Sequence, residues 1–440
     1  MNNTTGWIVA GAVLFTSTTV LGGGTLYVRT DGNDSNDGTS PETALQTIQE
    51  AVNRCDSDDW TIYVAPGSYV EMVEIGVGEG DEAQSGSAGS PNSIVGDITG
   101  IMTESSAGQV IIAGADDELE NAITMGIKIS GRSHWSFANL TFQGQSLFNV
   151  YSRNASGITV RSCSFADASR YAAYLIYGVD MSISDSTFHR DDDGGSGVWM
   201  MPSWRSSESG YFRFNQNTLV ATGDRYEHSP YPAGHFRKNG RRRLYENGVV
   251  VWSFGRSDVE IEITNNVLSD YYLPIFAFGR GAFSTIAVNN NTISRCFYGQ
   301  YAAGPSGAAV TMNNNIASEI YRQPSVRPAN STVENNLVYS WHELWNGGIA
   351  GSSGLIDDQD PLFSNPGAGD FSLTANSPAV DAGSETGIPS IDILGNRRTW
   401  DGDSDGVAAT DIGAYEYGSI PAVDQVRVVQ WESRPPVDHR

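Results

Sequence analysis

The sequence predicts an all-β solenoid, a parallel β-helix, and a recurring phrase is the main observation behind this prediction. Its form is apolar, any, apolar, any, amide-like, amide-like, any, apolar. The copies occupy residues 135–142, 158–165, 181–188, 212–219, 261–268, 286–293, 310–317 and, with a weaker start, 331–338. A repeat of this length is typical of solenoids, in which each unit buries its apolar face against its neighbours.

The phrase describes two short strands joined by a bend. Its first and third positions share one strand face, and its eighth position points inward again from a second strand. Further strands are expected before the later copies, at residues 248–254, 274–279 and 299–303. An antiparallel sandwich with turns every 8–12 residues is the alternative. It is less favoured because a sandwich does not need the same phrase at the same place.

The sixth position of the phrase carries a second pattern. It reads Leu140, Cys163, Ser186, Asn217, Asn266, Asn291, Asn315 and Asn336. Asparagine suits a bend because it tolerates the left-handed backbone conformation and bonds to nearby backbone. We therefore expect the last five amides to stack as a ladder, about 4.8 Å apart.

The composition is strongly acidic. The 440 residues have a formal net charge of −25, and Lys128 and Lys238 are the only lysines. A surface of this charge argues against nucleic-acid binding. It is typical of proteins from salt-loving organisms, where salt screens the self-repulsion, and equally of soluble extracellular proteins.

Residues 1–24 form an apolar N-terminal segment. The apolar run at residues 7–15 is too short to span a bilayer, and the first positive charge is Arg29. We expect an assembly anchor rather than a cleaved secretion signal, with both interpretations open, and no membrane span. If residues 1–24 are retained on a fold that is typical of extracellular proteins, a virion protein is favoured.

Residues 25–75 are expected to cap the column. A strand at residues 26–28 precedes a turn cluster at residues 31–38. A helix should then start with Ser40 as its N-cap and Pro41 in its first turn, and place Ala44, Leu45, Ile48, Ala51 and Val52 on one face. A strand at residues 61–64 follows.

The cap carries a family resemblance. Residues 27–28 (Tyr-Val), 32–38 (Gly-Asn-Asp-Ser-Asn-Asp-Gly), 47–49 (Thr-Ile-Gln) and 63–69 (Tyr-Val-Ala-Pro-Gly-Ser-Tyr) resemble the first coil of right-handed parallel β-helix proteins of the pectin-lyase-like superfamily. The resemblance implies a right-handed column, with the β-helix itself at residues 76–346. It also implies three possible roles, which are polysaccharide lyase, glycoside hydrolase and viral tailspike.

Residues 347–418 are expected to form a separate small β module. Four motifs occur in order, at residues 360–363 (Asp-Pro-Leu-Phe), 369–373 (Gly-Asp-Phe-Ser-Leu), 377–383 (Ser-Pro-Ala-Val-Asp-Ala-Gly) and 411–416 (Asp-Ile-Gly-Ala-Tyr-Glu). Together they resemble the choice-of-anchor Q module of surface proteins. Residues 419–440 form a tail without a membrane-length apolar run, and its alternating stretch at residues 423–431 is suited to adding a strand to a partner.

A calcium site is the one cofactor that the sequence suggests. Asp401, Asp403 and Asp405 alternate before Gly406, and Asp411 follows. Calcium needs six to eight oxygen ligands, which a tight acidic turn can supply. The position where an EF-hand has glutamate is Ile412, so the loop is not an EF-hand. A solvated acidic turn is the alternative.

Two insertions follow the eighth position of the phrase on consecutive coils. Residues 197–201 align with residues 248–252, which places the insertions 189–196 and 220–247 at one corner. The first is acidic, with Asp191, Asp192 and Asp193, and the second is basic. Loops on a rigid scaffold are where binding and catalysis concentrate.

Three interpretations of these loops stay open. In the first, they form structural salt bridges with each other or with a neighbouring subunit. In the second, arginines and aromatic rings bind an acidic glycan or a partner protein. The residues of this binding set are Trp199, Trp204, Tyr226, Tyr231, Arg237, Arg241, Arg242 and Arg243. In the third, the loops are catalytic, with Lys238 as the base of a lyase or Asp191, Asp192 and Asp193 as acids of a hydrolase.

The favoured function is a virion or cell-surface spike that attaches to a host or glycan, located on a virion surface or outside the cell. We expect a homo-oligomer that contacts other virion or surface proteins and a surface polysaccharide or glycoprotein. The alternative is a secreted polysaccharide lyase or glycoside hydrolase that acts on acidic polysaccharide. Fold kinship alone supports this alternative.

Overall fold

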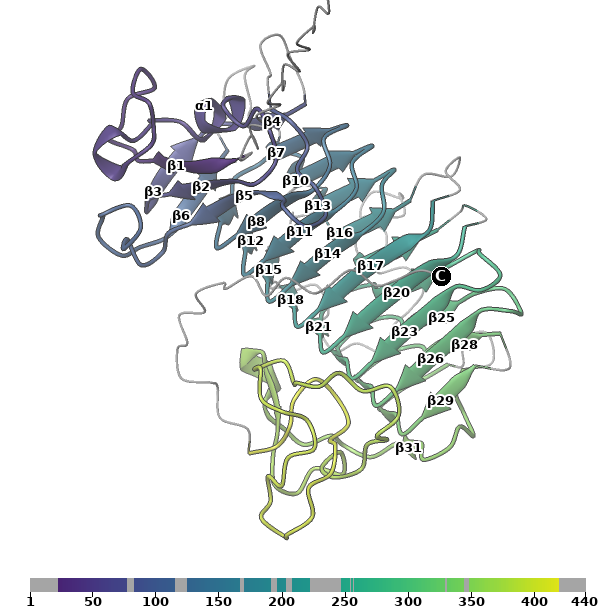
Figure 1. Ribbon diagram of the computed structural model, residues 1–440. Coiled ribbons are helices and arrows are strands. Elements are labelled where there is room, and N and C mark those ends of the chain that lie inside the picture. Colours follow the sequence, from purple (N-terminus) through teal and green to yellow (C-terminus); the bar gives the residue numbers. More distant parts are fainter. Residues whose placement is uncertain are drawn as a thin grey trace, which may run out of the picture.

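The computed structural model describes residues 23–76, 83–114, 125–166, 170–190, 196–202, 208–221, 247–253, 255, 257–328, 331–343 and 348–418. Within these residues the chain winds into a column with three long parallel sheets along its sides (Figure 1). The all-β, right-handed parallel β-helix that the sequence predicts is therefore confirmed.

Three sheets, called A, B and C below, contain almost all of the strands. Sheet A consists, in spatial order, of β1 (Gly24–Val28), β2 (Trp60–Val64), β5 (Asn92–Gly96), β8 (Trp135–Ala138), β11 (Ile158–Arg161), β14 (Met181–Ser184), β17 (Gly210–Asn215), β20 (Val259–Thr264), β23 (Thr285–Asn289), β26 (Ala309–Asn313) and β29 (Thr332–Glu334). Sheet B consists of β3 (Gly67–Val70), β6 (Val110–Ala113), β9 (Thr141–Gln143), β12 (Ser164–Ala166), β15 (Thr187–Arg190), β18 (Thr218–Ala221), β21 (Val267–Ser269), β24 (Thr292–Ser294), β27 (Ile316–Ser318), β30 (Leu337–Tyr339) and β31 (Ile356–Asp357). Sheet C consists of β4 (Val73–Ile75), β7 (Met125–Ser130), β10 (Phe148–Arg153), β13 (Tyr171–Ile176), β16 (Ser196–Met201), β19 (Asn247–Trp252), β22 (Leu273–Phe278), β25 (Tyr301–Ala303) and β28 (Ser325–Arg327).

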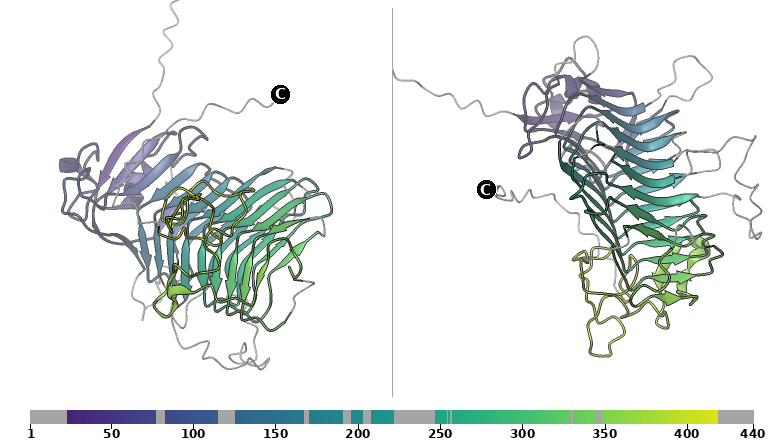
Figure 2. Two further views of the ribbon diagram at one scale, coloured as in Figure 1. Left: turned by 90° about the horizontal axis from the view of Figure 1, so that it is seen from below. Right: turned by 90° about the vertical axis from the view of Figure 1, so that its right-hand side faces the viewer.

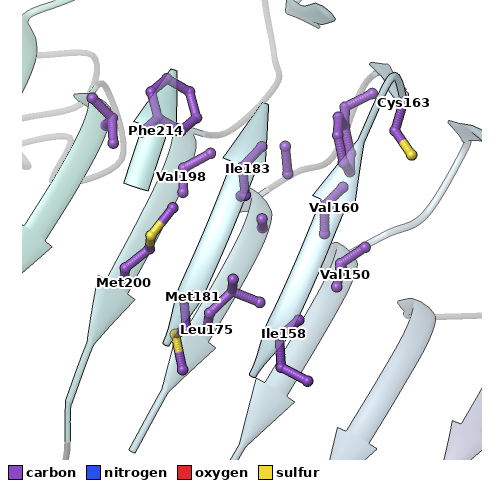
Figure 3. Packing of buried hydrophobic residues seen from close by; sticks show 14 of the residues in the cluster. Val150, Ile158, Val160, Cys163, Leu175, Met181, Ile183, Val198, Met200 and Phe214 are labelled. Carbon is purple, nitrogen blue, oxygen red and sulfur yellow. The ribbon is translucent and has the colours of Figure 1, made fainter. Parts of the chain in front are cut away.

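Each coil passes through sheets A, B and C in turn, and the recurring phrase forms the corner between A and B. The copies stack in register, since Ile158 pairs with Trp135 in sheet A and Phe165 pairs with Phe142 in sheet B. The column interior is apolar (Figure 3). Within it the eighth-position rings Phe142, Phe165 and Phe188 stack at centroid distances of 5.1 Å and 4.6 Å.

The two polar positions of the phrase have separate roles. The fifth position is left-handed in every copy, from φ 57° at Asn139 to φ 49° at Asn335. The sixth position forms the predicted ladder inside the column. Asn266 Nδ2 donates to Asn291 Oδ1 at 3.0 Å, and Asn291 Nδ2 donates to Asn315 Oδ1 at 3.1 Å. The vertical stacking of these amides is confirmed.

The cap differs from the prediction in one respect. The expected single helix is two short pieces, the 3-10 turn η1 (Pro41–Thr43) and the helix α1 (Ile48–Asn53). Ser40 is the N-cap of η1 as predicted. The helix is interrupted because the backbone of Leu45 bonds to Tyr27 and Arg29 at the edge of β1, so that this residue is extended. Leu45 therefore packs as an added edge of sheet A.

Residues 348–418 form a C-terminal module with little regular structure, which lies against one side of the column (Figures 1 and 2). Its elements are the antiparallel pair β32 (Phe363–Asn365) and β33 (Asp370–Leu373) and the 3-10 turn η4 (Pro366–Ala368). Its apolar residues Ile412 and Leu373 share a buried cluster with Ile316 and Leu337 on the outer face of sheet B. Among the residues described, no helix has the length and apolar character that crossing a membrane requires.

Candidate functional site on the outer face of sheet C

Sheet C presents aromatic side chains to the outside on six adjacent strands. Successive strands pair Tyr151 with Tyr174 and Tyr174 with Trp199, and further along pair Phe276 with Tyr301. Their neighbours in each strand, such as Val150 and Ala173, are buried in the column. Because strand side chains alternate between faces, the rings point outward.

The rings contact one another from coil to coil. We call the set Tyr151, Tyr174, Trp199, Trp252, Phe276 and Tyr301 the aromatic stripe. Centroid distances between consecutive members are 6.0, 6.5, 6.1, 5.4 and 5.1 Å. All six side chains are partly exposed. The stripe therefore offers an apolar but accessible surface, with ring edges and polar tips that reach solvent.

Trp199 lies in the middle of the stripe. Its ring also meets Tyr171 edge-on at 5.8 Å. Its indole Nε1 is buried and has no hydrogen-bond partner among the described residues. An indole N–H usually finds a partner when it is buried, so this donor is left unsatisfied by the described residues.

The charged groups beside the stripe are mainly basic. At outward positions of the described sheet C strands they are Glu74, Lys128, Arg153 and Arg327, and Lys128 pairs with Glu74 at 2.8 Å. The guanidinium of Arg153 lies 5.5 Å from the ring centroid of Tyr177. An excess of positive charge on one face of a chain with net charge −25 favours an anionic ligand there.

The described strands show where the two insertions leave the column. Arg190 and Ala221, each the second residue of its predicted insertion, pair in sheet B. Val198 and Val249, which follow them, pair in sheet C. The predicted alignment of residues 197–201 with 248–252 is thus confirmed. Both insertions join sheet B to sheet C on adjacent coils, directly before the strands that carry Trp199 and Trp252.

Most of the predicted binding and catalytic residues lie outside the described residues. These are Asp191, Asp192, Asp193, Trp204, Tyr226, Tyr231, Arg237, Lys238, Arg241, Arg242 and Arg243. Trp199 is described, and it lies in the stripe. The sequence analysis missed the other five members of the stripe. Their signal was an aromatic residue at the paired outward position of five of these strands, whereas the sixth strand has Val250 there and carries Trp252 two residues further on.

The predicted calcium residues do not all come together. Asp403 and Asp405 each place a carboxylate oxygen within 4.8 Å of one from Asp381, which the sequence analysis did not select. Asp411 is instead buried, and its carboxylate accepts hydrogen bonds from the backbone of Asp381 and Tyr417. Asp401 accepts a bond from Gly406 N at 3.2 Å. Burial and the neighbouring carboxylates raise the pKa of Asp381, as expected for an acidic cluster that a cation would stabilise.

The parallel β-helix with an aromatic outer face identifies the chain as a solenoid protein. It does not identify a single activity. The chain belongs to the right-handed β-helix family, because the family described as "Right handed beta helix region" matches residues 118–355. That match ends at residue 355, so the resemblance to choice-of-anchor Q stays a prediction. No curated protein matches the chain.

Solved structures that are similar to this chain include both lyases and hydrolases. A structure titled "Glycoside hydrolase" has a TM-score of 0.52 at 10% identity, over 76% of this chain and 96% of that chain. The pectate lyase Pel9A has a TM-score of 0.47 at 16% identity, over 89% and 96% of the two chains. A rhamnogalacturonan lyase has a TM-score of 0.41 at 13% identity, over 78% and 90%. At these identities the similarity concerns the fold alone.

Proposed function

We propose that this chain is a virion or cell-surface β-helix protein of the spike type, which binds acidic polysaccharide or glycoprotein glycans along the outer face of sheet C. The single observation that carries the proposal is the aromatic stripe across six adjacent strands. Aromatic rings supply large contact areas at low conformational cost and bind the apolar faces of sugars. The basic groups beside the stripe favour an anionic chain.

The proposed spike also has a location, on a virion or cell surface, and an oligomeric assembly. A rigid column holds a binding face at a fixed distance from its anchor, which suits attachment on a virion surface or outside the cell. The predicted homo-oligomer would present several such faces together and raise the avidity for a repeating polymer. Contacts with other virion or surface proteins belong to the same proposal.

We expect Trp199→Ala to weaken binding of an acidic polysaccharide such as pectate or alginate about tenfold, or 1.4 kcal/mol. The reason is that this substitution removes the central ring from the stripe. Affinity electrophoresis of the full chain in gels that contain the polysaccharide measures the effect. Tyr63→Ala is the matched control, because Tyr63 stacks on Tyr27 at 6.0 Å on sheet A, away from the stripe. Equal losses in both variants, or none in either, would contradict the proposal.

A secreted polysaccharide lyase or hydrolase is the second candidate, favoured by one observation. Both insertions end at sheet C strands that carry the stripe. Asp191, Asp192, Asp193 and Lys238 therefore belong to segments that lead directly into the proposed binding face. Incubation with the same polysaccharides separates the two candidates. Ultraviolet-absorbing unsaturated products would identify a lyase, and new reducing ends without such absorption would identify a hydrolase.

We also propose that Asp403 and Asp405 bind Ca²⁺, with Asp381 in place of Asp411. Carboxylate oxygens at these distances suit a hard cation. We expect calcium to raise the melting temperature and a chelator to lower it, and Asp403→Ala to abolish the difference. Asp360→Ala is the control, because this exposed carboxylate only caps the backbone of Leu362. A melting temperature that does not change when calcium is added or removed would contradict the proposed calcium site.

A further inference from the structure

The C-terminal module binds the column through a segment that follows the corner between sheets A and B. We call residues 382–392 the strap. Its backbone carbonyls accept hydrogen bonds from successive coils: Ala382 from Asn335 (2.8 Å), Ser384 from Asn314 (2.7 Å), Gly387 from Asn289 (3.1 Å), Ile391 from Asn265 (2.6 Å) and Asp392 from Gln216 (3.1 Å). The strap therefore runs along the column toward the cap, and the outward amides at the corner act as its receptor.

The same corner continues beyond the strap as a groove. One coil past Gln216 the corner residue is Asp185, and then come Ser162 and Asn139. These three residues line a groove of about 320 Å³. The amide of Asn139 has no hydrogen-bond partner within the described part of the chain, so it is available in the way that Asn265 is available to the strap.

The far side of the groove is formed by the loop between β5 and β6. Ile98 in this loop lines the groove. Ile98, Ile101 and Met102 are 48%, 74% and 41% exposed. Large apolar side chains that cluster in the open on so acidic a chain mark an interaction surface.

The floor of the groove differs from the surface under the module. Beneath the module the outward row of sheet B is mainly apolar and buried, with Val267, Thr292, Ile316 and Leu337. In the groove the same row contains Thr141, Ser164 and Thr187. Hydroxyl groups can be exposed to water at little cost in free energy. Such a floor is therefore suited to a segment that binds reversibly.

We infer that the chain's own tail, residues 419–440, docks in this groove as a second strap. The described chain ends at Gly418, two residues after Glu416, whose N–H bonds to Asp392 at the end of the strap nearest the groove. The alternating stretch 423–431 (Val-Asp-Gln-Val-Arg-Val-Val-Gln-Trp) can span roughly 30 Å when extended. The groove needs only three to four coil spacings, about 15–20 Å. The stretch is therefore long enough to fill the groove and to bring Trp431 to the apolar loop.

Cysteine labelling tests the inference, because the native thiols are buried and should not react. Cys55, Cys163 and Cys296 are at most 2% exposed. Thr187→Cys places a thiol in the groove, in the full chain and in a chain that ends at Gly418. We expect maleimide to label the full chain at least tenfold more slowly. Adding a synthetic peptide of residues 419–440 to the shortened chain should restore the protection.

Thr159→Cys on the outer face of sheet A is the matched control, and it should react equally in both chains. Equal labelling of the Thr187→Cys thiol with and without the tail would overturn the inference. Protection that disappears on dilution of the full chain would also overturn it, since the tail would then come from a second copy. Glycan binding at sheet C is measured separately, so neither result bears on the proposed function.

Discussion

Asn291→Ala is expected to lower the free energy of unfolding by about 4 kcal/mol, because one substitution removes a whole rung of the ladder. Asn291 Oδ1 accepts from the N–H and the amide of Asn266, at 3.1 Å and 3.0 Å. Asn291 Nδ2 donates to Ile263 O at 2.8 Å and to Asn315 Oδ1 at 3.1 Å. Alanine takes the acceptor from the buried backbone N–H of Asn266, which costs about 1–3 kcal/mol. It also removes one bond each from Asn266 Nδ2, Ile263 O and Asn315 Oδ1, at about 1 kcal/mol each.

Urea unfolding of the full chain measures this effect. Asn365→Ala is the control, because Asn365 is exposed and its side chain makes no capping bond. It should change stability by less than about 0.5 kcal/mol. A loss at Asn291 as small as the loss at Asn365 would show that the ladder does not stabilise the column.

Arg398→Met is expected to detach the C-terminal module. The guanidinium is fully buried where the module meets the column, and it bonds to Glu416 at 2.5 Å, to Asn265 Oδ1 at 2.6 Å and to Gly413 O at 2.9 Å. Removing the guanidinium takes the donor from Glu416, Asn265 Oδ1 and Gly413 O, all in a buried site, and each such loss costs about 1–3 kcal/mol. Hydrogen exchange of residues 379–418, followed by mass spectrometry, should become faster by roughly two to three orders of magnitude.

The same cluster should make docking depend on pH. Burial raises the pKa of Glu416 to about 8 and that of Asp411 to about 6. Arg398 is one cation beside these two carboxyls, so it cannot compensate both charges. A carboxyl with a raised pKa binds its proton more tightly in the folded state. The contribution of these two carboxyls to docking should therefore be largest below about pH 4, and it should fall as the pH rises from there to about 8.

Two variants control for these effects. Arg213→Met removes a surface pair with Glu260, in which the side chains are 39% and 51% exposed, and it should cost less than about 1 kcal/mol. Glu416→Gln should remove the part of the pH dependence between about 6 and 8. Protection factors of the module, which are exchange rates corrected for the intrinsic rate at each pH, that are the same at pH 5 and pH 8 would rule out this titration.

The repeat alone was enough to predict the column. A phrase such as residues 261–268 specifies which side chains point inward, where the chain bends and which amide stacks on the next coil. These are interactions between neighbours one coil apart, and the period itself supplies the alignment. Ser40 as an N-cap was predictable for the same reason, since its bond to Thr43 is local. The interruption of the cap helix was not, because Leu45 bonds to a strand that the local pattern does not include.

Contacts between segments far apart in the chain were decided by the tertiary structure alone. The module binds the column through side chains such as Asn265, which forms bonds with residues more than 120 positions away. Asp381 joins Asp403 and Asp405 only because the module folds back on itself, which also turns Asp411 toward the backbone. The aromatic stripe was likewise not predictable, because the long insertion gives Trp199 and Trp252 a spacing that differs from the repeat period. The sequence by itself determined the repeated, one-dimensional part of this protein, because stacking is local. The position of the docked module and the composition of the binding face were visible only in the folded chain. Both depend on long-range contacts that the repeat period does not predict.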